Sequence, residues 1–281
     1  MQRPDVSVLS GESIAPLIEL LAGRRFVTLS GAGCSTESGI PDYRGNGRSG
    51  PRNPIQHDAF LRNSEVRRRY WARATLGWQR FTAAEPNPGH RALAALEEAG
   101  PLAGVITQNV DRLHHRAGSR YVVELHGALE DVSCLRCGAA HTRQDVHARL
   151  LSANPDWLRL AADIRPDGDA DLPAEAVAGF HVVACGSCGG ELKPDVVFFG
   201  GTVPEPTVTA AWELFERGEV LLVAGSSLTV YSGFRFVRRA AERGVPIAII
   251  NLGPTRADAL AAIKVDLPTA QALPALADAL L

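Results

Sequence analysis

Four of the five cysteines form two pairs with the spacing of metal ligands. Each pair has the pattern C-x-x-C, and the pairs are Cys134 with Cys137 and Cys185 with Cys188. Four thiolates that leave no open coordination position are typical of a structural zinc ion and not of a catalytic one. Neighbouring glycines that permit the tight turns are Gly138, Gly186, Gly189 and Gly190. The pattern predicts one structural zinc, with two disulfides or a redox pair as the alternatives.

A glycine-rich segment has the composition of a dinucleotide-binding turn. Residues 27–45 read VTLSGAGCSTESGIPDYRG, so an apolar strand runs into Gly31–Gly33 and we expect a helix to start near Ser35. Glycines there let the backbone approach a pyrophosphate, and a helix N-terminus favours its charge. Thr36 replaces the third glycine of the usual fingerprint, and the acidic residue expected about 20 residues later is missing. The alternative is a tight strand-to-helix turn, in which Cys34 is either a reactive thiol or a small buried side chain.

Polar side chains follow the apolar segment Leu102–Thr107. Gln108, Asn109 and Asp111 would lie beyond the carboxyl end of that strand, where α/β sheets bind their ligands. Amide and carboxylate groups at this place can hydrogen-bond a ribose and a carboxamide. The alternative is that Asn109 and Asp111 cap the following helix.

A histidine follows the next apolar segment, residues 121–125. His126 would lie at a strand end, and an imidazole can act as a general base near neutral pH. The alternative is a histidine whose hydrogen bonds are satisfied in the core or at the surface.

Apolar and amphipathic segments alternate along most of the chain. The segments that predict strands are residues 25–30, 102–107, 121–125, 219–225, 245–251 and 263–267. Those with helical periodicity are residues 11–22, 89–99, 204–217 and 232–243. This alternation predicts an α/β fold with a Rossmann-like, doubly wound parallel sheet.

Two stretches interrupt the alternation. Residues 42–85 contain a helical segment at 63–82, and residues 130–193 contain both cysteine pairs and a predicted flexible loop at 165–173. We expect the helical insertion 42–85 and the zinc-ribbon insertion 130–193 to form a smaller second domain. The Rossmann-like domain then comprises residues 1–41, 86–129 and 194–281.

Length and charge narrow the class of protein. A chain of 281 residues with 46% hydrophobic residues can bury a sizeable core, and its net charge of −2 disfavours nucleic-acid and membrane-surface partners. No apolar run reaches the roughly 18 residues of a membrane span. The N-terminus lacks the charged-then-apolar layout of an export signal, so we expect a cytoplasmic location. The oligomeric state is not indicated.

Five segments, in order, resemble signature segments of the sirtuins. They are GAGCSTESGIPDYR at 31–44, TQNVDRLH at 107–114, His126-Gly127, GSS at 225–227 and NLG at 251–253. Together with the four cysteines they span most of the chain, and the variant forms look like the class II branch of the family.

The resemblance implies a reaction between NAD and the acyl-lysine of a protein or peptide. Nicotinamide leaves, the acyl oxygen attacks the ribose, and the products are free lysine and O-acyl-ADP-ribose. His126 would be the general base, Asn109 would help expel nicotinamide and position the ribose, and Asp111 would bind the nicotinamide amide. Tyr43 would shield the reactive ribose from water.

The resemblance also implies a larger set of NAD contacts. The set is Gly31, Ala32, Gly33, Ser35, Thr36, Glu37, Ile40, Pro41, Asp42, Tyr43, Arg44, Gln108, Asn109, Asp111, His126, Gly225, Ser226, Ser227, Asn251, Leu252, Gly253 and Thr269.

Residues 196–201, VVFFGG, resemble the sirtuin segment whose backbone pairs with the substrate peptide as an added strand. The implied peptide contacts are Val196, Phe198, Phe199 and Gly200. Gly201 departs from the common form, which has an acidic residue there.

Tyr70 and Arg73 lie three residues apart in a predicted helix and so share a face. They resemble the pair with which some sirtuins bind the carboxylate of an acidic acyl group. Our hypothesis is that acidic or longer acyl groups are removed better than acetyl. The alternative is a helix with a solvated basic face, with Tyr70 and Trp71 packed inward.

Three other functions compete with a deacylase. A protein mono-ADP-ribosyltransferase would use the same NAD site, and a non-catalytic zinc-ribbon binding module would explain the cysteines alone. A Rossmann oxidoreductase is disfavoured by the missing third glycine and the missing ribose-binding acid.

Overall fold

The computed structural model describes residues 9–11, 13–42, 54–159, 172 and 177–281. The chain divides into two compact units. Unit 1 comprises Met1–Gly39, Glu85–Leu125 and Val203–Leu281, and unit 2 comprises Ile40–Ala84 and His126–Thr202. The predicted contacts Tyr43 and Arg44, and all of the predicted loop 165–173 except Leu172, lie outside the described residues.

Unit 1 contains a parallel sheet built from seven of the described strands. Their order is β1-β10-β9-β8-β2-β3-β4. The strands are β1 (Leu9–Gly11), β2 (Phe26–Ser30), β3 (Leu102–Thr107), β4 (Val122–Glu124), β8 (Val220–Ala224), β9 (Ile247–Ile250) and β10 (Ile263–Val265). Read from β4 to β10, this is the doubly wound order in which successive strands run outward on either side of β2. The predicted fold class is confirmed, and the strand order reverses between β2 and β8.

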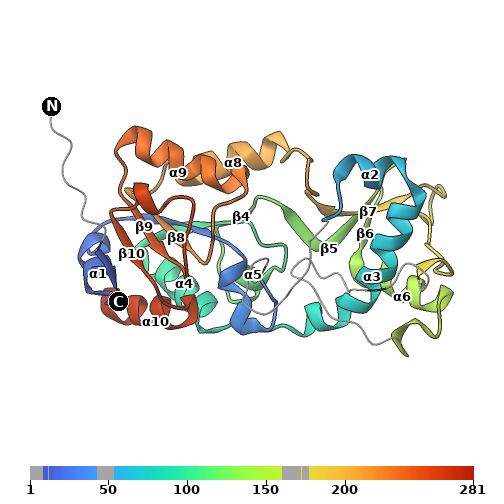
Figure 1. The fold of residues 1–281 in the computed structure, drawn as a ribbon, viewed down its shortest axis with the longest axis horizontal. Helices are drawn as coiled ribbons and strands as arrows, with labels where there is room; N and C mark the ends of the chain where they lie inside the picture. Colours follow the sequence, from blue (N-terminus) through green and yellow to red (C-terminus); the bar gives the residue numbers. More distant parts are fainter. Residues whose placement is uncertain (1–8, 12, 43–53, 160–171, 173–176) are drawn as a thin grey trace. The chain divides into compact units, whose positions relative to one another are not determined.

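Helices cover both faces of this sheet (Figure 1). One layer contains α1 (Ala15–Leu21), α4 (Pro88–Ala99) and α10 (Thr269–Leu280), and the other contains α8 (Glu205–Phe215) and α9 (Tyr231–Arg243). The short helix α5 (Leu113–Arg116) and the 3-10 turn η4 (Asp258–Leu260) complete the unit. Every residue of β2, β3, β8 and β9 is buried, which explains their continuous apolar sequences.

Two expectations for unit 1 need correction. The glycine-rich loop does not start an α-helix near Ser35 but forms two 3-10 turns, η1 (Ala32–Cys34) and η2 (Thr36–Ser38). Gly39 ends them in a left-handed conformation with φ of 85°, and Pro41 disfavours a helical conformation at Ile40. The helix α10 has no counterpart among the predicted elements, because it carries Pro274 and no recognisable motif.

Unit 2 combines helices with a three-stranded antiparallel sheet of order β6-β5-β7. The elements are α2 (His57–Arg62), α3 (Ser64–Ala83), β5 (Gly127–Cys134), β6 (Ala140–Thr142), α6 (Arg143–Ala153), η3 (Trp157–Arg159) and β7 (Leu192–Val196). Asn63 caps α3 by accepting hydrogen bonds from two backbone N–H groups. The core is aromatic, and the buried guanidinium of Arg143 lies 4.8 Å from the ring centre of Trp71 and 5.1 Å from that of Trp78.

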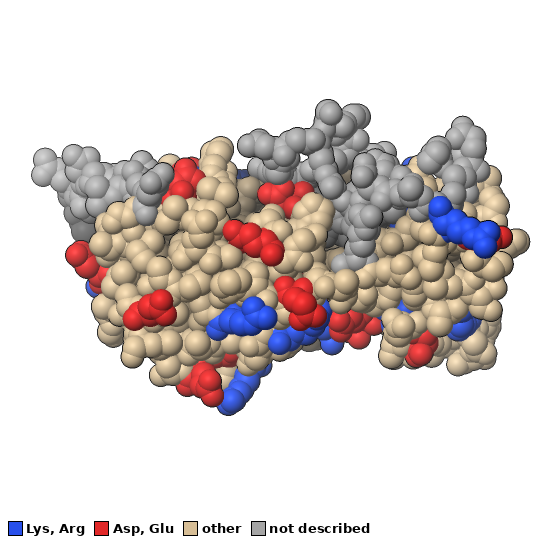
Figure 2. Space-filling view, turned by 90° about the horizontal axis from the view of Figure 1, so that it is seen from below, with Lys and Arg blue, Asp and Glu red and all other residues tan. Residues whose placement is uncertain are grey.

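The described surface carries both signs of charge. On the face seen in Figure 2, Lys and Arg side chains are interspersed with Asp and Glu side chains and form no continuous basic patch among the described residues. None of the described helices has the length and apolar character needed to cross a membrane.

Candidate functional site

The four paired cysteines converge in unit 2. Their sulfur atoms all lie within 4.8 Å of one another, with 3.5 Å between Cys134 and Cys188 and 3.9 Å between Cys137 and Cys185. Sulfurs at about 2.3 Å from a tetrahedral zinc ion lie about 3.8 Å apart, so the four donors fit one ion. These distances are well above the length of a disulfide bond, about 2.05 Å, so the arrangement favours a zinc ion over two disulfides.

Backbone groups prepare the cysteine cluster for negative charge. Hydrogen bonds from backbone N–H groups, that of Ser187 foremost, lower the pKa of Cys185 to about 5. The backbone N–H of Gly190 donates to the sulfur of Cys188 at 3.3 Å, but the neighbouring sulfurs, that of Cys137 foremost, outweigh this bond and raise the pKa of Cys188 to about 12. A Cβ at Gly190 would lie 2.9 Å from the sulfur of Cys134, so this turn requires glycine. Thiolates stabilised in this way are the form that binds zinc.

In unit 1 the glycine loop packs against the loop that follows β8. The N–H of Gly33 donates to the carbonyl of Gly225 at 2.8 Å. A Cβ at Gly31 would lie 2.7 Å from the Cβ of Ser226, and one at Gly33 would lie 2.9 Å from the Gly225 carbonyl. Both glycines are therefore needed for the close approach of two loops at the point where the strand order reverses, which is where such sheets bind ligands.

Three predicted residues form a buried hydrogen-bond cluster beside this loop. Asn109 donates through Nδ2 to the carbonyl of Gly31 at 3.0 Å and to Oγ of Ser35 at 3.1 Å. Ser35 donates in turn to Oδ2 of Asp111 at 2.6 Å. All three side chains are buried. The cluster joins the loop after β2 to the loop after β3.

The alternative that Asn109 and Asp111 cap the following helix holds for Asp111 alone. Oδ1 of Asp111 accepts the N–H of Leu113 at 3.0 Å, so Asp111 does support α5, whereas the Asn109 side chain contacts the glycine loop. Burial raises the pKa of Asp111 above its ordinary value, although the hydrogen bond from Ser35 opposes that shift.

Gln108 links the loop after β3 to the loop after β8 at the carboxyl edge of the unit 1 sheet. Its Nε2 donates to Oγ of Ser226 at 2.8 Å. The helix α9 approaches this amide closely, since a Cβ at Gly233 would lie 2.5 Å from its Oε1. The predicted loop residues after β2, β3 and β8 thus lie together in unit 1.

The remaining predicted contacts of unit 1 lie on the loops that follow β2, β8, β9 and β10. Nδ2 of Asn251 donates to the carbonyls of Leu252 and Gly253, which shapes the turn after β9. Thr269 is buried at the start of α10 and donates to the carbonyl of Gly33 at 3.3 Å, so the C-terminal helix reaches the glycine loop. Ala32, Thr36 and Glu37 lie in the 3-10 turns, and Ser227 follows Ser226.

His126 lies in unit 2, at the junction before β5. Its carbonyl accepts the N–H of Val197 at 2.9 Å. The next residue, Gly127, has φ of 72°, and a Cβ there would lie 1.9 Å from the carbonyl oxygen of Asp195. This position requires glycine, and the resulting turn places His126 next to the segment predicted to bind the peptide.

The predicted peptide and acyl contacts are grouped in unit 2. The ring of Phe198 lies 5.3 Å from that of Tyr70 in an edge-to-face arrangement. Phe199 is 42% exposed, and its carbonyl accepts the N–H of His57 at 2.8 Å. Tyr70, Trp71 and Arg73 are all buried, so the inward packing of Tyr70 and Trp71 holds, whereas a solvated basic face does not extend to Arg73. The other predicted residues of this unit are Val196, Gly200, Ile40, Pro41 and Asp42.

Sequence reasoning missed part of the polar network in unit 1. Asn87 and His90 form a capping box at the start of α4, and Nδ2 of Asn87 donates to the carbonyl of Cys34 at 2.8 Å. The sequence did indicate this helix start, because Asn87 is followed by Pro88 and His90 lies three residues after Asn87. Cys34 itself is fully buried, and burial raises the pKa of its thiol to about 12, which excludes a reactive thiol.

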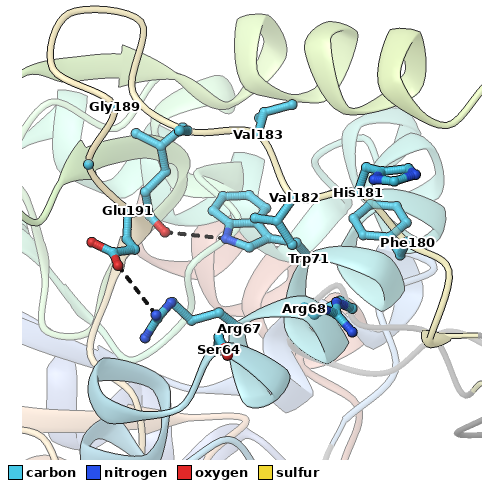
Figure 3. Close-up of a pocket in the computed structure, with 13 residues that line it drawn as sticks. Ser64, Arg67, Arg68, Trp71, Phe180, His181, Val182, Val183, Gly189 and Glu191 are labelled. Carbon is cyan, nitrogen blue, oxygen red and sulfur yellow. Dashed lines mark hydrogen bonds and ion pairs between the residues drawn. The ribbon is translucent and has the colours of Figure 1, made fainter.

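A pocket of about 350 Å³ in unit 2 contains none of the predicted site residues. Figure 3 shows Trp71, whose Nε1 donates to the carbonyl of Leu192 at 3.2 Å, and Arg67, paired with Glu191 at 3.4 Å. These contacts tie α3 to the strand that follows the second cysteine pair, so the residues around the pocket have a structural role.

Comparison with known proteins agrees with these arrangements. The profile described as "Sir2 family" matches residues 31–232. The chain is 54% identical over 268 residues to NAD-dependent protein deacetylase 1 of Streptomyces coelicolor, covering 95% of this chain and 90% of the relative. It is 51% identical over 269 residues to NAD-dependent protein deacetylase 1 of Mycobacterium avium, covering 94% of both chains.

Solved structures give the same result. The chain is similar to the structure described as "Sir2-p53 peptide-NAD+", with a TM-score of 0.73, 31% identity and coverage of 95% of this chain and 98% of that one. It is also similar to "Structure of Sir2Tm bound to a propionylated peptide", with a TM-score of 0.74, 32% identity and the same coverage.

Proposed function

The chain belongs to the Sir2 family, and on that basis we propose that it is an NAD-dependent protein-lysine deacylase. The substrates are NAD, one water molecule and the acyl-lysine of a protein or peptide, and the products are nicotinamide, O-acyl-ADP-ribose and the free lysine. Most of the predicted NAD contacts belong to unit 1, whereas we assign zinc and peptide binding to unit 2.

One observation carries the proposal. Asn109, Ser35 and Asp111 form a buried cluster at the carboxyl edge of the sheet, beside the point where the strand order reverses. A buried amide and a buried carboxylate at that place suit a ribose and a carboxamide, which offer hydroxyls, a carbonyl and an N–H₂ group.

The roles of the side chains follow from their chemistry. NAD supplies an activated ribose carbon when nicotinamide leaves. Asn109 holds the ribose, and Asp111, an acceptor held by Ser35, receives the N–H₂ of the carboxamide. His126 takes the proton of a ribose hydroxyl as general base and is left as an imidazolium until it returns that proton. The loop that contains Asp42, Tyr43 and Arg44 excludes water.

Zinc has no part in the chemistry. The four cysteines fill all positions of a tetrahedral ion, so the ion holds unit 2 together. Free thiols that serve as ligands persist in a reducing compartment, which supports a cytoplasmic location.

The experiment is nicotinamide release with acetyl-, propionyl- and succinyl-lysine peptides, repeated with His126→Tyr. We expect the variant to lose about 100-fold or more of the rate, the range of general-base catalysis. His115→Gln, beside the site motif but 40% exposed, is the control and keeps the rate within about twofold of the wild type. Product mass spectrometry separates O-acyl-ADP-ribose from an ADP-ribosylated protein; the latter product alone would replace the deacylase with the transferase.

We also propose that acidic or longer acyl groups are preferred over acetyl. The buried pair Tyr70 and Arg73, next to Phe198 of the peptide segment, supports this preference. Arg73→Met should reduce turnover of the succinyl peptide at least tenfold more than that of the acetyl peptide. Equal losses on both peptides would contradict the preference and leave the deacylase assignment intact.

A further inference from the structure

A second group of metal-binding side chains lies in unit 1, away from the four paired cysteines. Cys34 of η1, His90 of α4 and His114 of α5 each offer one donor atom, and these three atoms all lie within 4.8 Å of one another. All three side chains are buried, with 0%, 0% and 1% of their surface exposed. The deacylase reaction proposed above uses none of them.

One donor atom of this group is buried without a partner. Nε2 of His114 lies 2.8 Å from Oγ of Ser30, which in turn donates to Oγ1 of Thr107 at 2.8 Å. Because the Ser30 hydroxyl proton is used in that bond, Nε2 carries the proton of the imidazole and donates it to Ser30. Nδ1 of His114 is then an unprotonated acceptor, and it has no hydrogen-bond partner.

This pattern is characteristic of a metal-binding histidine. Such a residue binds the ion through one nitrogen and donates its other N–H to a nearby oxygen, which fixes the ring. Ser30 is that oxygen for His114. An unpartnered buried acceptor is unfavourable, so an ion at Nδ1 would remove a cost that the protein now carries.

The other two donors are also suited to a cation. His90 makes only long hydrogen bonds, to the N–H of Asn87 at 3.3 Å and to Oγ of Ser35 at 3.5 Å, so ligation displaces little. Cys34 supplies a sulfur donor, which thiophilic cations prefer.

We propose that Cys34, His90 and His114 form a second metal site, which binds a thiophilic divalent cation such as Zn²⁺ or Cd²⁺. One thiolate and two imidazoles are a donor set that these ions favour. The thiol releases its proton when the ion binds. Donors around a tetrahedral zinc ion lie about 3.3–3.6 Å apart, so the three side chains close in slightly and fix the glycine loop to α4 and α5.

The wild-type protein tests the proposal directly. The full chain without a purification tag, with both sites exchanged to ¹¹³Cd, is examined by ¹¹³Cd NMR and by metal analysis. We expect two equivalents of cadmium and two resonances, one from four sulfurs and one from a mixed sulfur and nitrogen site. A single equivalent with a single resonance at saturating cadmium would overturn the proposal.

Variants then identify the ligands. Cys34→Ser and His114→Gln should lose the second equivalent and keep the first, with native circular dichroism as the check on folding. Ser30→Ala should weaken the second equivalent about 10-fold, because the partner of Nε2 is removed. His115→Gln is the matched control and should bind within twofold of the wild type. Unchanged binding by folded Cys34→Ser would also overturn the proposal.

Discussion

In unit 1 a seven-stranded parallel sheet holds the functional loops, whereas in unit 2 a three-stranded sheet ends at four cysteines. The large sheet is covered on both faces by buried apolar residues, and its site residues are linked by buried hydrogen bonds. The small sheet has partly exposed strands, and its two cysteine pairs come from separate parts of the chain. Stability is therefore distributed in unit 1 and concentrated at single points in unit 2.

Removal of the metal should produce the largest difference in stability between the two units. Structural zinc contributes about 10 kcal/mol or more in small zinc-binding domains, so chelation should unfold the region around β5 and β7. Hydrogen exchange measured by mass spectrometry should show lost protection there, while β2, β3 and β8 stay protected. Activity should fall to background and return when zinc is added back. Full protection of β5 and β7 in protein shown to be metal-free would contradict the comparison.

A single methyl group should have the next largest effect. Gly127→Ala places a Cβ 1.9 Å from the carbonyl oxygen of Asp195, in a backbone with φ of 72°. The β5–β7 pairing next to His126 must shift, and we expect a loss of about 3 kcal/mol or more in the free energy of unfolding. Urea denaturation measures this value.

The chain offers a matched control for that change. Gly138 also has φ of 72°, but a Cβ there would meet no atom within 4 Å. Gly138→Ala should therefore cost only the backbone term of about 1 kcal/mol. Similar losses of unfolding free energy for the two variants would show that the close contact between Gly127 and Asp195 does not stabilise the fold. The contact would then not hold His126 rigidly in place.

Such contacts mark the limit of what the sequence could predict. The strands of unit 1 were recognisable because residues buried on both faces leave continuous apolar runs, and Leu102–Thr107 matches β3 at both ends. The strand Gly127–Cys134 was missed because it is partly exposed and reads GALEDVSC, without a clear apolar run. The clash at Gly127 depends on Asp195, which no local pattern connects to it.

In the functional site, too, local sequence predicted the residues but not the contacts between distant parts of the chain. Its motif residues were predicted from their resemblance to a known family, and the cysteine set from its spacing. The links between Ser35 and Asp111, and between Asn87 and Cys34, join residues 76 and 53 positions apart. Only the doubly wound topology brings them together. The 3-10 turns in place of a helix follow from Gly39 and Pro41, whose combined effect outweighed the general pattern of such loops.

A change in unit 1 should affect binding without affecting stability. Gly233→Ala places a Cβ 2.5 Å from Oε1 of Gln108 and displaces the end of that flexible side chain from Ser226. Alanine favours a helix over glycine by about 1 kcal/mol, so unfolding should be unchanged or harder. The KM for NAD should rise about fivefold with little change in kcat at saturating NAD. Arg239→Ala on an exposed position of α9 is the control, and an unchanged KM in Gly233→Ala would remove Gln108 from the NAD site.

The smallest effect should come from an ion pair of unit 1 that includes none of the predicted NAD contacts. Nζ of Lys264 lies 2.9 Å from Oδ2 of Asp258. Burial alone would raise the pKa of Asp258, but hydrogen bonds from Thr255 and Lys264 outweigh it and hold that pKa below the ordinary value of 3.8. A depressed carboxyl pKa stabilises the fold above the ordinary value, and the contribution is lost as the pH falls through the lower value in the folded state.

Asp258→Asn measures this contribution. Lys264 is only 9% exposed, but the carboxylate of Asp258 is partly exposed and the amide oxygen of asparagine can still accept a hydrogen bond from Nζ, so the variant should lose no more than about 1 kcal/mol at pH 7. The difference from the wild type should be constant between about pH 7 and pH 5 and shrink below about pH 4. Asp278→Asn, in α10 without a resolved pKa shift, is the control. A loss of several kcal/mol would mean that unit 1, like unit 2, depends on single polar contacts, because a unit with distributed stability loses little when one ion pair is removed.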